Sequence, residues 1–209
     1  MTMLLVAKYG DSVIMTADKR VTEIDGSGEV VKVKSDEYEK IKVIDDRYVI
    51  SFAGVTIVAE RAFEWINQNL DVLTLNDIDP LYFFKKAFNY GKEYFEAVHP
   101  GHDPITVFYL GYITQQHEPI LIGFSSDDNY NGMEIQELSI KMVSKRNEEA
   151  ETYRFVISEV LKRKHYYQTP RNFARLNFKA IKRIDDEMIG KTAYSIILSP
   201  ERIKEYHHK

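Results

Sequence analysis

Two short apolar segments at the start of the chain constrain its fold more than any other part of the sequence. Residues 3–9 and 12–18 are dominated by apolar side chains, and Gly10-Asp11 lies between them. Two such runs joined by two residues that include glycine are typical of a β-hairpin. Because both strands are apolar throughout, we expect them to be covered on two faces. The hairpin also brings Asp18, at the end of its second strand, close to Thr2.

The remaining sequence alternates between strand-like and helix-like patterns. A turn-rich loop is expected over residues 21–28, and strands are expected at residues 30–33, 40–44, 48–53, 105–113, 119–124, 133–143 and 193–198. Apolar residues at helical spacing predict helices over residues 56–69, 80–98, 147–163, 170–184 and, at the end, 201–206. This order favours a single α+β domain over residues 1–209, with two packed sheets between two helical layers.

The composition excludes several classes of protein. A formal net charge of -4 argues against a broad basic surface for nucleic acid. The absence of cysteine excludes disulfides, a cysteine nucleophile and thiolate metal sites. No apolar run approaches the roughly 20 residues of a membrane helix, and residues 1–6 lack the basic start of a signal peptide. We therefore expect a soluble, cytoplasmic protein with no nucleic-acid or membrane partner.

Thr2 is a candidate nucleophile because of its position. Removal of Met1 would make Thr2 the N-terminal residue. An N-terminal threonine carries its own potential base, an α-amine whose reference pKa is roughly 7.7–8.0. The hairpin would then place the carboxylate of Asp18 near the threonine hydroxyl.

Three further segments carry a family resemblance. Together with Thr2, the runs V-I-M-T-A-D-K-R-V-T (residues 13–22), E-K-I-K-V-I (residues 39–44) and S-F-A-G (residues 51–54) resemble the proteasome β-subunits and the related bacterial ATPase-dependent peptidase. These proteins are N-terminal-nucleophile hydrolases. The resemblance is dense over residues 2–66 and faint beyond. It implies that the α+β fold is the four-layer αββα sandwich of these hydrolases.

The resemblance implies a catalytic group of Thr2, Asp18 and Lys40, with Gly54 beside it. In the family, the threonine hydroxyl attacks the peptide carbonyl, forms an acyl-enzyme and is released by water. The proton acceptor would be either the freed α-amine or Lys40 poised by Asp18, and the sequence leaves both open. Gly54 matches the glycine whose backbone N–H faces the developing oxyanion. A purely stabilising ion pair between Asp18 and Lys40 is the alternative explanation for these two charges.

Two more residues match supporting positions of the family. Arg20 corresponds to an arginine that organises the charges around the lysine, and alignment on Gly190 puts Asp186 at a supporting aspartate near the last strand. Ile189 stands where the family has a serine. The family's Gly-Ser-Gly turn before the third helix has no counterpart in residues 143–147.

The resemblance also implies residues that bind the substrate. Thr22 matches a threonine whose backbone pairs with the peptide, which would then be held as an added strand. Phe52 lies two residues before Gly54 and matches the position that lines the pocket for the side chain preceding the cut. A bulky aromatic residue there is expected to shorten the pocket and to disfavour large or charged side chains.

The implied activity is that of a threonine endopeptidase that needs no metal or organic cofactor. Family members form homo-oligomeric rings with the nucleophiles inside, and a separate ATP-dependent unfoldase feeds them unfolded protein. Two alternatives remain: a structural or regulatory ring subunit without turnover, and a small-molecule amidohydrolase on the same fold. Thr2 behind a single Met1 favours the peptidase, since a structural subunit has no need of it.

Overall fold

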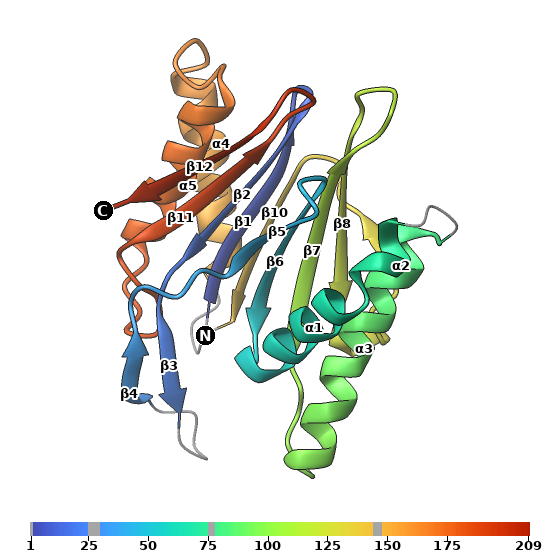
Figure 1. Ribbon diagram of the computed structural model, residues 1–209. Helices are drawn as coiled ribbons and strands as arrows, with labels where there is room; N and C mark the ends of the chain where they lie inside the picture. The colour runs from blue at the N-terminus through green and yellow to red at the C-terminus, as the bar shows by residue number, and fades with distance from the viewer. Residues whose placement is uncertain (1, 25–29, 75–77, 144–147) are drawn as a thin grey trace.

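A computed structural model describes residues 2–24, 30–74, 78–143 and 148–209 (Figure 1). This part of the chain forms 12 strands and 5 helices. The strands are β1 (Thr2–Tyr9), β2 (Ser12–Asp18), β3 (Val21–Ile24), β4 (Val30–Ser35), β5 (Ile41–Ile44), β6 (Tyr48–Gly54), β7 (Thr106–Ile113), β8 (Pro119–Ser125), β9 (Met133–Glu134), β10 (Leu138–Val143), β11 (Ala193–Leu198) and β12 (Ile203–His208). The helices are α1 (Thr56–Gln68), α2 (Leu70–Thr74), α3 (Pro80–Val98), α4 (Glu149–Lys162) and α5 (Pro170–Arg183).

All strand pairs in the described residues are antiparallel and form three sheets. The first sheet has the order β10-β1-β2-β11-β12, the second has the order β5-β6-β7-β8-β9, and β3 and β4 form a separate pair. β1 therefore lies between its hairpin partner β2 and β10. In this register Thr2 lies opposite Val143, and Leu4 lies opposite Ala17.

Three apolar clusters hold these elements together. One lies between the first and second sheets and includes Leu4, Met15 and Val49. The second joins α1 and α3 to the second sheet, where the rings of Phe88 and Phe108 stack with centroids 4.0 Å apart. The third joins α4 and α5 to the first sheet. The expected hairpin of two strands, each covered on both faces, is confirmed, because β1 and β2 contribute to the cluster on each side.

The expected four-layer αββα sandwich is wrong as a description of this fold. The described chain is a strand-rich mixed α+β fold with three antiparallel sheets, and the β3–β4 pair stands outside the two larger ones (Figure 1). Residues 21–24 were expected to be loop, but they pair with β4. The tip expected at residues 25–28 lies outside the described residues.

Two other expectations at the element level also need correction. Residues 201–206 do not form a helix, because Ile203–His208 pairs along β11 after a tight turn in which Ser199 and Arg202 exchange backbone hydrogen bonds. The single strand expected at residues 133–143 is two strands in different sheets, since β9 pairs with β8 and β10 pairs with β1. No helix among the described residues has the length and apolar character needed to cross a membrane.

A chain of polar side chains fixes β12 to the first sheet. The Asn177 amide donates to Thr16 Oγ1 at 3.3 Å, Thr16 Oγ1 lies 2.9 Å from Ser195 Oγ, and Ser195 Oγ lies 2.8 Å from His208 Nε2. The pKa of His208 is lowered by burial, with smaller contributions from the positive charge of Arg175 on α5 and from His207. The folded state therefore favours the neutral imidazole.

We predict that His208 makes the fold less stable in mild acid. A lowered pKa means that its contribution is fully present above the ordinary value of 6.5 and is lost as the pH falls below that value. The melting temperature of the wild type should therefore fall more steeply between about pH 7 and pH 5 than that of His208→Gln, because glutamine does not titrate in this range. Parallel pH profiles for the two proteins would contradict this assignment.

Candidate active site

The candidate site lies where β2 ends and β5 begins. Asp18 is the last residue of β2, and Lys40 directly precedes β5. The backbone fixes both positions: Lys19 N–H donates to Thr192 O at 3.3 Å, and Phe52 N–H donates to Lys40 O at 3.2 Å. Both side chains are buried, with Asp18 0% exposed and Lys40 2% exposed.

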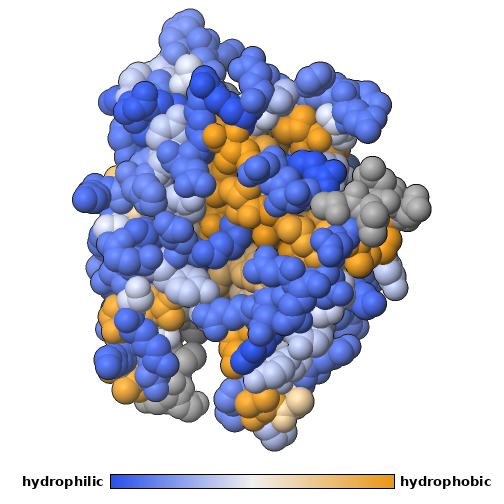
Figure 2. All heavy atoms as spheres, viewed as in Figure 1, coloured by the Kyte–Doolittle hydropathy of each residue, from blue (hydrophilic) through white to orange (hydrophobic). Residues whose placement is uncertain are grey.

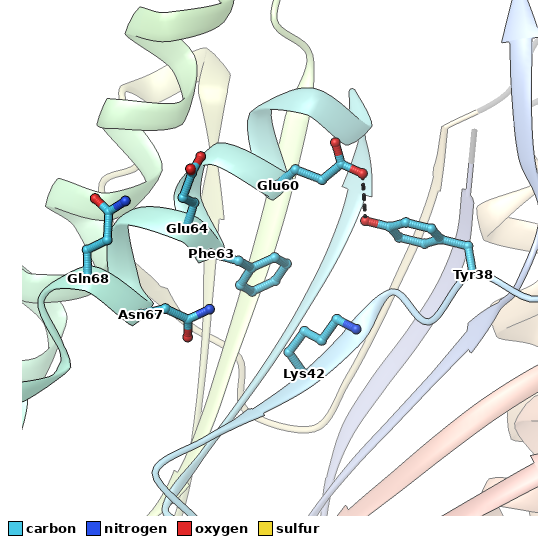
Figure 3. Close-up of a pocket in the computed structure, with 7 residues that line it drawn as sticks. All are labelled: Tyr38, Lys42, Glu60, Phe63, Glu64, Asn67 and Gln68. Carbon is cyan, nitrogen blue, oxygen red and sulfur yellow. Dashed lines mark hydrogen bonds between the residues drawn. The ribbon is translucent and has the colours of Figure 1, made fainter.

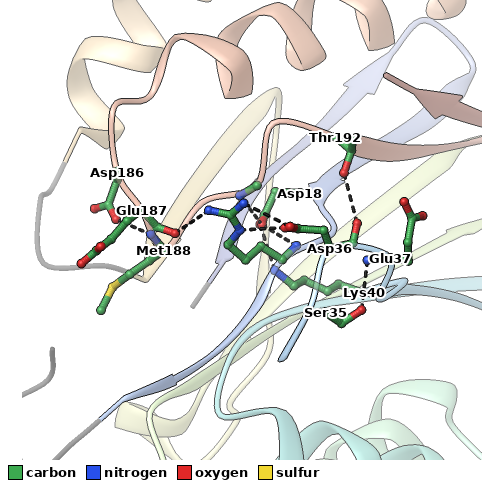
Figure 4. Close-up of polar contacts among 11 residues, drawn as sticks. Asp18, Ser35, Asp36, Glu37, Lys40, Asp186, Glu187, Met188 and Thr192 are labelled. Carbon is green, nitrogen blue, oxygen red and sulfur yellow. Dashed lines mark hydrogen bonds and ion pairs between the residues drawn. The ribbon is translucent and has the colours of Figure 1, made fainter. Parts of the chain in front are cut away.

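The carboxylate of Asp18 accepts hydrogen bonds from four donors. Oδ1 receives Lys40 Nζ at 2.9 Å and the backbone N–H of Met3 at 2.8 Å. Oδ2 receives the backbone N–H groups of Arg20 at 2.9 Å and Gly190 at 3.1 Å. These donors replace the hydrogen bonds to water that the carboxylate loses on burial. Figure 4 shows Asp18 and Lys40 at the centre of the resulting polar network.

Lys40 is a buried amine beside a buried carboxylate. Burial lowers the pKa of its ammonium, and the charge and hydrogen bond of Asp18 oppose that shift. Desolvation is the larger effect, so the net direction is downward. A lysine with a lowered pKa is a better proton acceptor near neutral pH than an exposed lysine.

Arg20 organises the outer side of the network. Its guanidinium donates to Asp36 Oδ1 at 2.7 Å, to Asp36 Oδ2 at 3.2 Å and to the carbonyl of Glu187 at 2.7 Å. The hydrogen bond from Arg20 is the largest cause that lowers the pKa of Asp36. Arg20 therefore contacts Asp18 through its backbone N–H, whereas its side chain joins the segments that carry Asp36 and Glu187.

Asp186 supports the site indirectly. Its carboxylate accepts the backbone N–H of Met188 at 2.8 Å, which closes a turn just before Gly190. This turn presents the Glu187 carbonyl to Arg20 and the Gly190 N–H to Asp18. Ile189, where the family has a serine, is a fully buried apolar residue.

Thr2 begins β1 next to this network and is 1% exposed. The next residue, Met3, binds the same carboxylate oxygen as Lys40. The backbone nitrogen of Met3 and the amine of Lys40 therefore lie within a few ångströms of each other. The expected group of Thr2, Asp18 and Lys40 thus lies at one end of the β1–β2 hairpin.

Gly54 occupies a position that only glycine fits. Its φ is +118°, and an added Cβ would lie 2.1 Å from the carbonyl oxygen of Ile105. The same carbonyl accepts the backbone N–H of Val55 at 3.0 Å. Close packing of the two segments therefore accounts for this glycine, and its role as oxyanion donor stays a prediction.

A cleft with a volume of about 560 Å³ opens beside these residues, and we refer to it as the cleft. Its lining includes Val143, the register partner of Thr2, together with Gly54 and Thr22. In the space-filling view the molecule is hollowed at its lower edge, between the β3–β4 pair and the α1–α3 side (Figure 2). Among the described strands β3 pairs only with β4, so no strand pairs with its other edge, and an unpaired edge is where a peptide can add as a strand.

Phe52 does not line this cleft. Its side chain is 0% exposed and lies in the core between the second sheet and α1, against Tyr38, Phe63 and Phe108. The burial of Phe52 argues against direct contact with substrate, which stays a prediction. The residues that do face the cleft include Tyr38 and Glu60.

Sequence reasoning missed several groups that build the site. The Gly190 and Met3 N–H groups and the Asp36 carboxylate carry no motif, and Tyr38 and Glu60 look like ordinary residues of a loop and a helix. Residues 144–147, where the family's supporting turn was missing, lie outside the described residues. Within the described part of the chain, no cluster of three or more His, Asp or Glu side chains is placed to hold a metal ion.

Comparison with known proteins assigns no family to the chain. No protein-family model matches it, and no curated protein matches it at a significant level.

We predict that the two partners of the buried ion pair differ in their effect on stability. Asp18→Asn leaves the buried ammonium of Lys40 without its carboxylate and should cost about 3–5 kcal/mol of unfolding free energy. Lys40→Met leaves Asp18 with three backbone donors and should cost less, about 1–3 kcal/mol. Urea unfolding of the three proteins measures both values. A larger loss for Lys40→Met would contradict the central role of Asp18.

We also predict that Gly54→Ala is far more damaging than Gly10→Ala. Gly10 has a φ of +61° and nothing within 4 Å of an added Cβ, so alanine there should cost only the left-handed backbone strain of about 1–2 kcal/mol. At Gly54 the collision with Ile105 adds to the strain, and the loss should reach about 3 kcal/mol or more. Equal melting temperatures for the two variants would refute this packing argument.

Proposed function

We propose that this protein is a threonine endopeptidase that uses Thr2 as its nucleophile once Met1 has been removed. The proposal rests on one observation: Asp18 Oδ1 accepts hydrogen bonds both from Lys40 Nζ and from the backbone N–H of Met3, the residue that follows Thr2. The backbone that carries Thr2 therefore lies next to a buried carboxylate and an amine with a lowered pKa, and Val143, the register partner of Thr2, lines the cleft.

The proposed reaction uses these groups in two steps. The Thr2 hydroxyl oxygen bonds to the peptide carbonyl carbon while its proton passes to Lys40 or to the freed α-amine, and both acceptors remain open. The peptide C–N bond then breaks and the proton goes to the leaving amine. Water cleaves the resulting ester and restores the hydroxyl. The Gly54 N–H is assigned to the developing oxyanion, and the free edge of β3 at Thr22 to the peptide backbone.

The proposal includes an assembly. The resemblance to the proteasome β-subunits supports a homo-oligomeric ring in which the clefts face an enclosed space, supplied by an ATP-dependent unfoldase. The substrate would then be unfolded protein or peptide. A catalytically inactive ring subunit is the second candidate, and the 1% exposure of Thr2 favours it. No observation favours the small-molecule amidohydrolase over these two.

We predict that Thr2→Ala abolishes peptide cleavage while Thr2→Ser keeps part of it. Loss of the nucleophile should lower turnover by about 10³-fold or more, since only binding and oxyanion contacts remain. Serine retains the hydroxyl and serves as the matched control. The assay uses short fluorogenic peptides, which need no unfoldase, and protein whose Met1 has been removed and whose mass has been checked.

A covalent label tests the same assignment without turnover. An epoxyketone reacts with both the hydroxyl and the free amine of an N-terminal threonine, so it should add once per subunit to the processed wild type and not to Thr2→Ala. If processed protein forms no adduct and cleaves no peptide, the catalytic proposal fails and the inactive ring subunit replaces it.

A further inference from the structure

Tyr38 and Glu60 form a shared wall between two cavities. Both residues line the cleft, and both also line a second cavity with a volume of about 460 Å³, which we call the outer cavity. The Tyr38 hydroxyl donates to Glu60 Oε1 at 3.3 Å (Figure 3). Figure 3 shows the two side chains pointing toward one another, with Glu64 farther along the same helix. The pair therefore sets how far a side chain entering the cleft can reach.

Tyr38 is held firmly enough to orient Glu60. Its backbone N–H donates to the carbonyl of Lys19 at 3.1 Å, and its ring meets Phe52 edge-on with centroids 6.2 Å apart. Burial is the largest cause that raises the pKa of Tyr38, followed by the charge of Glu60. The phenol therefore stays protonated and remains a donor to Glu60 at neutral pH. Tyr38 binds Oε1 of Glu60, and within the described residues no other hydrogen bond to this carboxylate is found, so Oε2 can accept from a ligand.

The charged groups of the cleft are in acidic excess. Glu60 and Asp103 contribute two carboxylates to its lining. Lys34 is the one cation among the described lining residues, and its ammonium lies 3.3 Å from Glu23, which offsets its charge. A cationic side chain in the cleft would therefore gain more than a neutral or acidic one.

We propose that the cleft selects a peptide with a basic side chain, and that Glu60, oriented by Tyr38, is the residue that binds it. This inference rests on the proposed function for the cleavage step, but the binding preference stands by itself. It differs from the expectation drawn from Phe52, because that side chain lies behind Tyr38 and the charge that faces the cleft belongs to Glu60. Glu60 acts on specificity, and Tyr38 is a positioning residue.

The test compares arginine with citrulline, which has nearly the same shape without the charge. Two fluorogenic tripeptides that differ only at the residue before the cut are assayed with processed wild-type protein. Because Glu60 is exposed to solvent, the arginine peptide should be preferred by about three- to tenfold in kcat/KM. Equal rates for the two peptides overturn the inference and leave the proposed function intact.

Three variants assign the preference to particular residues. Glu60→Gln should remove the preference for arginine, measured as the ratio of kcat/KM for the arginine peptide to kcat/KM for the citrulline peptide. Glu64→Gln is the matched control, since Glu64 lies one turn farther along α1 and lines only the outer cavity, and it should keep the preference. Tyr38→Phe removes the hydroxyl that orients Glu60 and should lower the same ratio without abolishing it. A preference that survives Glu60→Gln, or that Glu64→Gln removes equally, overturns the assignment.

A binding measurement separates this inference from the proposed function. Thr2→Ala protein is titrated with fluorescein-labelled forms of the same two peptides, and the double variant Thr2→Ala/Glu60→Gln is titrated in parallel. Tighter binding of the arginine peptide that depends on Glu60 supports the inference even if no peptide is ever cleaved. Equal affinities for the two peptides refute it, whether or not the wild type shows cleavage.

Discussion

The buried carboxylate of Asp18 is the constraint on which the site depends. Its four donors come from β1, from the residues just after β2, from the residue before β5 and from the turn before β11. A charged group 0% exposed is tolerated only when such donors replace water. The need to satisfy one side chain therefore brings together segments from two sheets and a distant turn.

The charges around this carboxylate divide into an inner and an outer pair. Asp18 and Lys40 are buried, whereas Arg20 and Asp36 are partly exposed and join the surrounding loops. Arg20 is thereby a second cation close to Lys40, and its charge contributes to lowering the pKa of Lys40. Glu60 lies on the exposed surface of α1, where its carboxylate is solvated and accepts a hydrogen bond from Tyr38. The proposed chemistry and the proposed substrate selection thus use different charges, so each proposal can be tested separately.

The sequence predicted well what local patterns determine and poorly what distant pairing determines. The β1–β2 hairpin and α3, with its Asp79 cap followed by Pro80, were predicted closely, because apolar runs and capping residues act within one element. Residues 201–206 were predicted as helix because six residues carry too little pattern to reveal pairing with β11. The contact between Tyr38 and Glu60 depends on how α1 lies beside a loop, and no motif encodes that. The four-layer fold was expected both from the order of the elements and from the resemblance, and neither anticipated the separate β3–β4 pair.

The Gly190 contact has a consequence for the time at which the site forms during synthesis. Asp18 and Lys40 are separated by 22 positions, whereas Gly190 lies 172 positions from Asp18. Domains gain their long-range contacts only after the distant segment has left the ribosome. The carboxylate therefore lacks the Gly190 donor until residue 190 has been made and has left the ribosome. Until then the nascent chain has an incomplete site, and the full set of four donors forms only after the segment around Gly190 has emerged.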